Sequence, residues 1–291
     1  MLLGIVVVDF YGVIVKSLGN LYPTPQLAFF RNFFAIAPIV FLLILTKEIS
    51  FIFKDITKKF LLLCFLRGIS FVLMQIFYYI SIINMSFATA TTLTFSSPIF
   101  IVILSIVILG ERIGIFRWSA IIIGFAGVLT IMSPTSEVFN YYSILPLLAA
   151  LFWAVSNIVL KFIPENFSNA KINFYSINFS YLGSFLILLS TTEYSHIQNN
   201  SHWGLMILIG ILGGFASILF SYAYRLVSPS TLAPFEYLGI PSSFLLGWIF
   251  FSEAPISQLF PGVIGIVLAG LIIIWREKKL SIEDDTSKKL H

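Results

Sequence analysis

The chain has 291 residues, of which 58% are hydrophobic and only 10% are charged, and its mean hydropathy is +0.99. Soluble domains carry about 25% charged residues, so this composition excludes a soluble globular protein and indicates a chain embedded in lipid. The net charge of +4 does not indicate nucleic-acid binding, because the basic residues are spread over short connections and the C-terminal end instead of one exposed face. The single cysteine, Cys64, excludes an intrachain disulfide.

Ten apolar segments follow one another along the chain, and each is long enough to cross a bilayer as a helix. They are 2–19, 27–46, 60–83, 86–109, 115–133, 142–161, 171–190, 203–223, 229–251 and 256–275. A segment that crosses lipid must satisfy its backbone polar groups internally, which favours helices, and the third and fourth must form a tight hairpin at Asn84-Met85. The sequence therefore predicts an all-α integral membrane protein with ten transmembrane helices.

A diverged internal repeat divides the chain into two halves. Residues 84–132 recur at 226–274 with the same landmarks in the same order, offset by 142 or 143 residues. These landmarks are Pro98, Glu111 and Ala126-Gly127 in the first copy, and Pro241, Glu253 and Ala269-Gly270 in the second. Such a repeat indicates two copies of one unit. We expect a first repeat of five helices at 1–134, a second at 142–276 and a cytoplasmic tail at 277–291.

The basic residues predict the orientation of the helices, because cytoplasmic connections are enriched in Lys and Arg. Those in the connections or at the helix ends beside them all fall on one side of the ten-helix topology: Lys47, Lys54, Lys58, Lys59, Arg112, Arg117, Lys161, Lys171, Arg225, Arg276, Lys278, Lys279, Lys288 and Lys289. Both termini are therefore expected in the cytoplasm. Since each copy has an odd number of spans, the second copy is inverted, which is a common architecture of secondary transporters with a substrate site at midplane.

Five ionisable residues lie inside the predicted helices: Asp9, Lys16, Arg31, Arg67 and Glu236. A charge facing lipid costs a few kcal/mol or more, so such residues usually face a cavity or a partner. Depth along the helices predicts an inner cluster of Asp9, Arg67 and Glu236 and an outer cluster of Lys16 and Arg31, both lining one substrate cavity. The alternatives are that the basic side chains extend to the membrane interface, or that Glu236 forms an ion pair with Arg67.

Aromatic and amide residues on the same predicted helices are further candidates for the substrate pocket: Gln75, Tyr78, Tyr79, Trp153, Asn157, Tyr222 and Tyr237. Aromatic residues at helical spacing more often pack or anchor the helix at the interface, so this alternative stays open. Pro98 and Pro241 remove backbone hydrogen bonds and should kink their helices, either as gating hinges or as static bends. The small residues between Gly210 and Gly214 predict close helix packing.

An enzymatic function has little support in the sequence. The three histidines, His196, His202 and His291, lie outside the predicted helices, and no metal-ligand spacing, nucleophile motif or nucleotide-binding P-loop is present. No cofactor or metal is therefore expected. A membrane scaffold without transport activity is a further alternative, but it does not explain charged residues inside the membrane.

The chain resembles the EamA type of the drug/metabolite transporter superfamily over nearly its whole length. The residues that carry the resemblance are Lys16, Pro25, Arg31, Arg67-Gly68, Tyr79, Ala88, Ala90, Pro98, Gly110-Glu111-Arg112, Trp118, Gly124 and Gly127, with Phe152-Trp153, Lys161, Pro241, Glu253 and Gly270 in the second half. The resemblance implies a ten-helix, two-repeat transporter of small organic metabolites, with both ends cytoplasmic, in a bacterial inner membrane.

Within that superfamily, AFFRNFF, FLRG and APFEYLGI look most like the S-adenosylmethionine uptake branch, although Glu236 does not match it. The sequence therefore favours a secondary transporter of an amphoteric metabolite such as an amino acid or S-adenosylmethionine. An exporter of amino acids and a riboflavin-type importer of the same fold are the alternatives. The expected partners are a small-molecule metabolite, the bilayer and either a proton or an exchanged solute, and a homodimer is compatible with this class.

Overall fold

The computed structural model describes residues 1–132, 141–191 and 194–253 and, beyond these, 262, 264, 265, 267–269, 271, 272 and 275. Within these residues all regular secondary structure is helical, so the predicted all-α class is confirmed. Seven helical segments of the described part of the chain are long and apolar enough to cross a membrane: Leu2–Gly19, Thr24–Leu45, Lys58–Asn84, Thr89–Leu109, Ile144–Phe162, Asn169–Thr191 and Asn200–Leu226.

The difference between seven spans and the predicted ten has three local reasons. The ninth predicted segment is interrupted, so it contains no single long helix. In the fifth predicted segment, the apolar helical stretch Ile115–Gly127 is shorter than the seven spans and is not counted among them. The tenth, 256–275, lies largely outside the described residues.

In the first half, α1 (Leu2–Gly19) is followed by α2 (Thr24–Phe34) and α3 (Ile36–Leu45), which together form the second span. Helix α4 (Lys58–Asn84) ends directly before α5 (Phe87–Thr94), as the predicted hairpin requires. The Ser86 hydroxyl caps α5 by accepting a hydrogen bond from the Thr89 amide at 3.1 Å, which satisfies a free N–H of the first turn. Helices α6 (Ser97–Leu109) and α7 (Ile115–Met132) complete this half.

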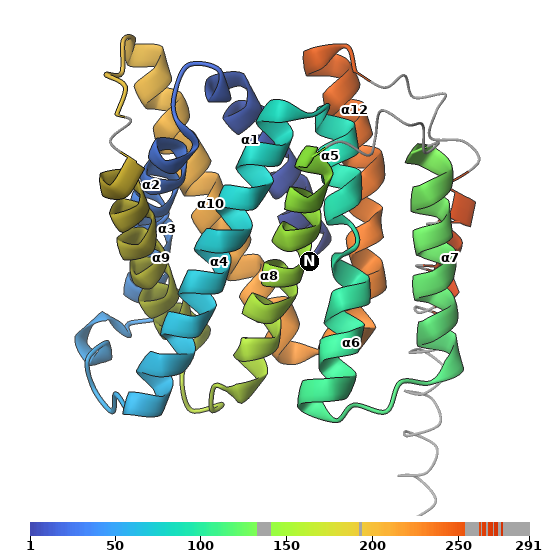
Figure 1. Ribbon diagram of the computed structural model, residues 1–291. Helices are drawn as coiled ribbons and strands as arrows, with labels where there is room; N and C mark the ends of the chain where they lie inside the picture. The colour runs from blue at the N-terminus through green and yellow to red at the C-terminus, as the bar shows by residue number, and fades with distance from the viewer. Residues whose placement is uncertain are drawn as a thin grey trace, which may run out of the picture.

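The second half contains α8 (Ile144–Val159), α9 (Asn169–Thr191) and α10 (Asn200–Leu226). Its next predicted span is broken into α11 (Pro229–Leu232), a 3₁₀ segment η5 (Ala233–Leu238) and α12 (Gly239–Phe251). Short 3₁₀ turns join the elements at Ile49–Phe51, Tyr141–Ser143 and Leu160–Phe162. In Figure 1, α6 runs toward the lower end of the bundle and the corresponding α12 toward the upper end, so the two repeats are inverted.

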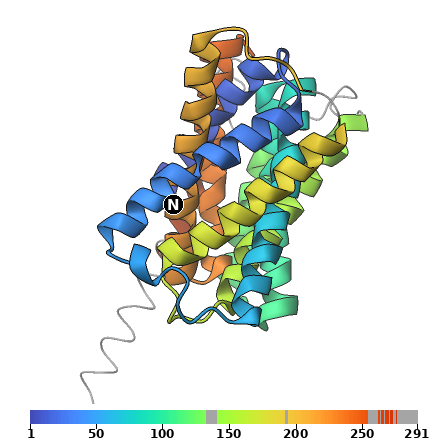
Figure 2. The ribbon, with the colours of Figure 1, turned by 90° about the vertical axis from the view of Figure 1, so that its left-hand side faces the viewer.

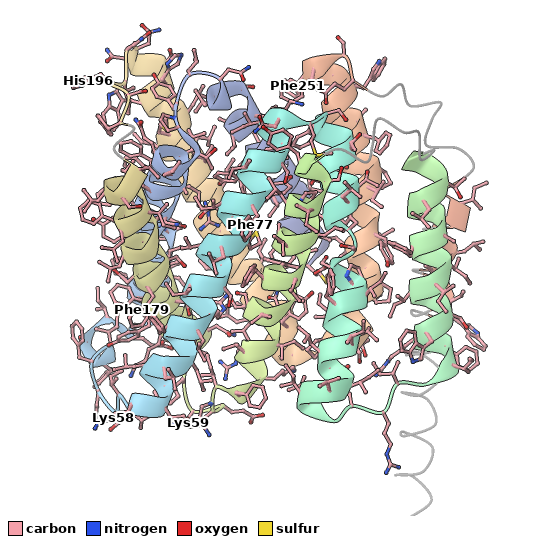
Figure 3. The ribbon with its side chains drawn as sticks, viewed as in Figure 1. Lys58, Lys59, Phe77, Phe179, His196 and Phe251 are labelled. Atoms are coloured by element: carbon pink, nitrogen blue, oxygen red, sulfur yellow. The ribbon has the colours of Figure 1, made fainter. Side chains whose placement is uncertain are left out.

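The two repeats interleave and do not form separate bodies. Helix α4 packs against α8, and α1 packs against α10 and α12, so the middle of the bundle combines elements of both halves (Figure 1). Helices α2 and α3 lie beside α9 and are inclined to the long axis of the bundle (Figure 2). Helix α7 lies at the opposite edge (Figure 1). Lys58 and Lys59 lie at one end of the bundle, and His196 and Phe251 at the other (Figure 3).

Close helix packing at the small residues of α10 is confirmed. A Cβ added at Gly210 would lie 2.3 Å from the Phe34 side chain, and one added at Gly214 would lie 2.6 Å from the Ala35 carbonyl oxygen. Without a side chain at these positions, α10 reaches the backbone where α2 meets α3. Lipid provides no hydrophobic force between helices, so this close contact contributes through van der Waals packing.

Candidate functional site

A cavity of about 880 Å³, including its opening, lies between the two repeats. Helices α1, α2, α4, α5, α6, α8 and α10 and the segment η5 contribute residues to its wall. Seven of the residues predicted from the sequence line it: Asp9, Arg31, Arg67, Tyr78, Trp153, Asn157 and Glu236. The cavity therefore collects four of the five ionisable residues that the sequence placed inside the helices.

Two interrupted helices meet at this cavity. The first interruption separates α5 from α6 at Phe95 and Ser96, and the second is η5. The Ser97 hydroxyl, at the start of α6, donates to Glu236 Oε2 in η5 at 2.5 Å. Interrupted transmembrane helices are tolerated where they line a cavity, and in transporters they commonly form the substrate site.

Glu236 is held by three neutral donors. Besides Ser97, the Trp153 indole Nε1 donates to Glu236 Oε1 at 2.7 Å and the Tyr224 hydroxyl donates to the same oxygen at 2.5 Å. Glu236 is 4% exposed, and Tyr224 is fully buried. These hydrogen bonds fix the carboxylate at the cavity wall without neutralising it.

Asp9, on α1, is the second carboxylate of the cavity and is 2% exposed. Its Oδ2 accepts a hydrogen bond from the Ser242 hydroxyl in the first turn of α12. The contact connects the first helix of one repeat to the interrupted span of the other. No basic side chain lies within ion-pair distance of Asp9 among the described residues.

Arg31, on α2, is 1% exposed and is held by neutral groups. One terminal nitrogen donates to Asn32 Oδ1 at 3.0 Å, and the other donates to the Gly213 carbonyl oxygen at 2.9 Å. The guanidinium carbon lies 4.6 Å from the centre of the Phe71 ring, which adds a cation–π contact. Gln75 is connected to Arg31 through Asn32, because Gln75 Oε1 accepts a hydrogen bond from Asn32 Nδ2 at 3.0 Å.

Arg67, on α4, is 7% exposed, and both its terminal nitrogens donate to Asn173 Oδ1 at 3.4 Å. Asn173 in turn donates to the Ser221 hydroxyl at 2.6 Å. The Nε atoms of Arg67 and Arg31 have no hydrogen-bond partner among the residues that the structure describes. The Glu236–Arg67 ion pair considered from the sequence is wrong, because these two residues form none within 4 Å.

The cavity therefore contains two guanidinium groups and two carboxylates, none of them in an ion pair within 4 Å among the described residues. Charges inside a membrane protein usually pair with one another or serve a function. An Arg side chain presents a planar fork that suits a carboxylate, and a carboxylate attracts an ammonium or another cation. The arrangement can bind a ligand that carries charges of both signs.

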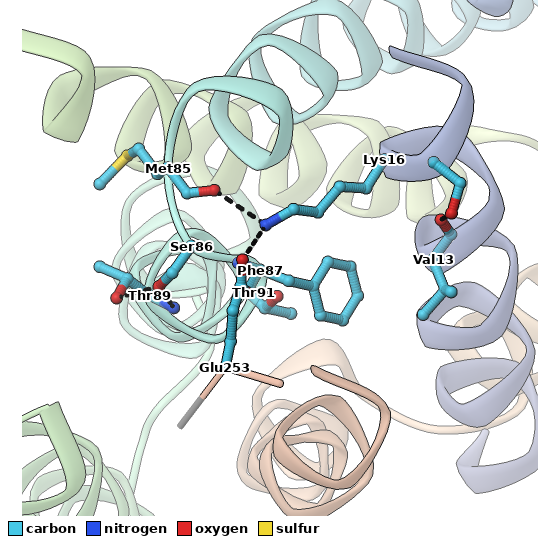
Figure 4. Close-up of polar contacts among 9 residues, drawn as sticks. Val13, Lys16, Met85, Ser86, Phe87, Thr89, Thr91 and Glu253 are labelled. Carbon is cyan, nitrogen blue, oxygen red and sulfur yellow. Dashed lines mark hydrogen bonds and ion pairs between the residues drawn. The ribbon is translucent and has the colours of Figure 1, made fainter. Parts of the chain in front are cut away.

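Lys16 lies away from the cavity wall, contrary to its predicted place in an outer cluster with Arg31. Its Nζ is 2.6 Å from Glu253 Oε1 and donates to the Met85 carbonyl oxygen at 3.1 Å (Figure 4). Glu253 Oε2 accepts from the Phe87 amide at 2.5 Å. This ion pair joins the last turn of α1 to Glu253, which lies just beyond the end of α12.

Four other predicted pocket residues are not in the cavity wall: Gln75, Tyr79, Tyr222 and Tyr237. Tyr222 is 40% exposed on the outside of α10, whereas Tyr237 is fully buried. Pro98 and Pro241 lie in the first turns of α6 and α12, so they follow a helix interruption and do not bend a continuous helix. Proline is tolerated in a first turn because its missing N–H would have had no partner in the helix.

The sequence analysis missed several residues that hold the ionisable groups, among them Asn32, Ser97, Asn173, Tyr224 and Ser242. Asn173 had the clearest signal, because an amide inside an apolar segment needs a hydrogen-bond partner. The hydroxyl groups gave no comparable signal, because a helical Ser can bond to its own backbone, as Ser221 does to Ser217.

Comparisons with known proteins place these features in a family. The family model described as the EamA-like transporter family matches residues 1–133 and 140–276. A crystal structure has the same fold, with a TM-score of 0.73 over 96% of this chain and 97% of that chain at 17% sequence identity.

Several proteins that are similar to this chain in sequence are named as transporters. The riboflavin transporter of Vibrio cholerae is 31% identical over 64% of this chain, and the match spans 62% of that relative's length. The S-adenosylmethionine uptake transporter of Rickettsia prowazekii is 26% identical over 96% of this chain and 92% of the relative. The pseudopaline exporter CntI of Pseudomonas aeruginosa is 26% identical over 91% of each. With its two matched repeats, the chain belongs to the EamA-like transporter family of the drug/metabolite transporter superfamily.

Proposed function

We propose that this protein is a secondary transporter of a small amphoteric organic metabolite, which binds in the cavity between the two repeats. The observation that carries the proposal is the set of four buried ionisable side chains around one cavity, none of them in an ion pair with another. The substrate carboxylate binds near Arg31 and Arg67. The substrate cation binds near Asp9 and Glu236, while Tyr78 and Trp153 contact its apolar part.

The first candidate substrate is S-adenosylmethionine. Two observations support it: the Rickettsia relative with that name aligns over nearly the whole chain, and the molecule carries one carboxylate, one ammonium and one sulfonium group. Transport is driven by the substrate gradient, by an exchanged solute or by protons. The relative with the riboflavin name supports a second candidate, but it aligns over a smaller part of the chain.

Uptake of labelled S-adenosylmethionine by cells that express the chain tests this proposal. We expect saturable uptake that unlabelled amphoteric compounds inhibit and that is lost in Glu236→Gln. Unlabelled amino acids, nucleosides and riboflavin serve as competitors, and membrane insertion is checked in parallel. Uptake of labelled riboflavin, together with no uptake of any amphoteric compound by the inserted protein, would contradict the proposal.

We also propose that the protein lies in a bacterial inner membrane with both termini in the cytoplasm. The end that carries Lys58 and Lys59 is then the inner end, in agreement with the enrichment of basic residues in cytoplasmic loops (Figure 3). The end that carries His196 and Phe251 is the outer end.

Labelling of single cysteines tests the orientation. In a Cys64→Ser background, a cysteine replacing the exposed Asp55 should react with an impermeant thiol reagent only from the cytoplasmic side. One replacing the exposed Asn199 should react only from the outside. The loop that contains Glu137 is also expected outside, but it lies beyond the described residues. Labelling of both cysteines from one side would overturn the inverted topology.

A further inference from the structure

The two repeats end their interrupted spans in the same way, at opposite ends of the molecule. Helix α6 ends in a left-handed residue, Gly110, with a φ of 67°, and α12 ends in Ser252, with a φ of 54°. A glutamate follows each, and its backbone amide donates to the carbonyl oxygen six residues earlier, at 3.1 Å for Glu111 and 3.2 Å for Glu253. Glu111 lies at the inner end and Glu253 at the outer end, because the repeats are inverted.

Each of these glutamates contacts the other repeat at an equivalent point. Glu253 Oε2 accepts from the Phe87 amide, which is the first residue of α5. Glu111 Oε2 accepts from the Ser230 hydroxyl in α11, which corresponds to α5 in the second repeat. Both contacts join the end of one interrupted span to the beginning of the other.

A lysine completes the contact at the outer end. Lys16, in the last turn of α1, places its Nζ 2.6 Å from Glu253 Oε1 and 3.1 Å from the Met85 carbonyl oxygen (Figure 4). Its side chain is 13% exposed, and that of Glu253 is 24% exposed. The ion pair connects α1 to the end of α12 and to the α4–α5 hairpin, so it links elements of both repeats at the outer end.

The corresponding lysine at the inner end is Lys161, in the turn that directly follows α8, the first helix of the second repeat. Its Nζ donates to the Arg225 carbonyl oxygen at 3.3 Å and forms no ion pair with Glu111 within 4 Å. Glu111 is held at the same end by the Ser230 hydroxyl, which donates to its Oε2. The inner end therefore has both members of the equivalent pair but holds them apart.

We propose that Lys16–Glu253 and Lys161–Glu111 are two alternating latches, of which the outer one is closed in this structure. When the inner end closes, Lys161 leaves the Arg225 carbonyl and pairs with Glu111, while Lys16 and Glu253 separate and open the outer end. Inverted repeats permit this exchange, because the two conformations are related by swapping the roles of the halves. A contact made in only one conformation shifts the equilibrium between the two.

This proposal rests on transport by alternating access through the cavity, but its test needs no substrate. The reporter is a cysteine replacing Thr94 at the cavity wall, in a Cys64→Ser background. An impermeant methanethiosulfonate reagent is applied to intact cells for access from outside and to inverted vesicles for access from inside. The ratio of the two labelling rates measures which end is open.

Removing the outer latch should open the outer end. We expect Glu253→Gln to raise the outside-to-inside ratio about tenfold or more, and Lys16→Met to act in the same direction. The labelling ratio of the double variant, Glu253→Gln with Lys16→Met, should be no higher than that of either single variant, because the two side chains act as one pair. Glu111→Gln should lower the ratio or leave it unchanged. Asp55→Asn, which removes a carboxylate at an exposed loop position, should leave the ratio unchanged.

Three results would overturn the proposal. The first is an unchanged ratio in both Glu253→Gln and Lys16→Met. The second is a Glu111→Gln variant that raises the ratio as Glu253→Gln does. The third is a double variant whose effect equals the product of the single effects. A labelling ratio that shifts as expected in a protein that takes up no amphoteric compound would support the latches and contradict the proposed substrate.

Discussion

Uptake of an amphoteric substrate is expected to fall about 10- to 100-fold in Glu236→Gln, whereas the variant should insert and fold normally. The glutamine oxygen can occupy the place of Oε1 and accept from Trp153 and Tyr224, as Glu236 does. Its amide can donate to the Ser97 hydroxyl, which can also act as an acceptor. The substitution therefore keeps the hydrogen bonds at the cavity wall and removes only the negative charge.

The size of this effect follows from the energy of a charged contact. A hydrogen bond to a charged group contributes about 1.5–3 kcal/mol, and every 1.4 kcal/mol changes an equilibrium constant about tenfold. Substrate uptake is measured at matched membrane levels of protein, with Asp55→Asn as the control for loss of a carboxylate at an exposed position. Arg67→Gln should lose uptake to a similar degree, because it removes a cation that faces the same cavity. Wild-type uptake in both Glu236→Gln and Arg67→Gln would contradict the proposed site.

The second large effect is expected at a glycine. An alanine Cβ at Gly213 would lie 2.4 Å from Arg31 Nε and 2.7 Å from Arg31 Cζ. The guanidinium cannot move away easily, because Asn32, Ser217 and the Phe71 ring surround it. Gly213→Ala must therefore displace Arg31 or separate α10 from α2. Overpacking of this kind costs about 1–3 kcal/mol, and the displaced cation should also reduce uptake about tenfold or more.

Gly204→Ala is the matched control, because Gly204 lies on the same helix and its added Cβ would meet open space. There, alanine should be neutral or stabilising, since glycine is about 1 kcal/mol less favourable than alanine inside a helix. Thermal unfolding in detergent and uptake in membranes are measured for both variants. A Gly213→Ala protein as stable and as active as Gly204→Ala would show that Arg31 is not held against α10.

The sequence located four of the cavity charges because charged residues inside apolar segments are rare and costly. It placed Lys16 wrongly for a geometric reason. Asp9 and Lys16 share one face of α1, but seven residues along a helix separate them by about 10 Å. That distance takes Lys16 from the level of the cavity to the outer end, where it meets Glu253. Helical periodicity gives the direction of a side chain and not the element packed against it.

The sequence alone determined the helical membrane class, the ten apolar segments and the two inverted repeats, because composition, segment length and internal repetition are local properties of the chain. Only the tertiary structure decided where the spans are interrupted, that Asp9, Arg31, Arg67 and Glu236 line one cavity without pairing, and that Lys16 pairs with Glu253. These contacts join residues far apart in sequence, such as Ser97 and Glu236 across 139 positions. They depend on how two interleaved repeats pack, which no local pattern specifies.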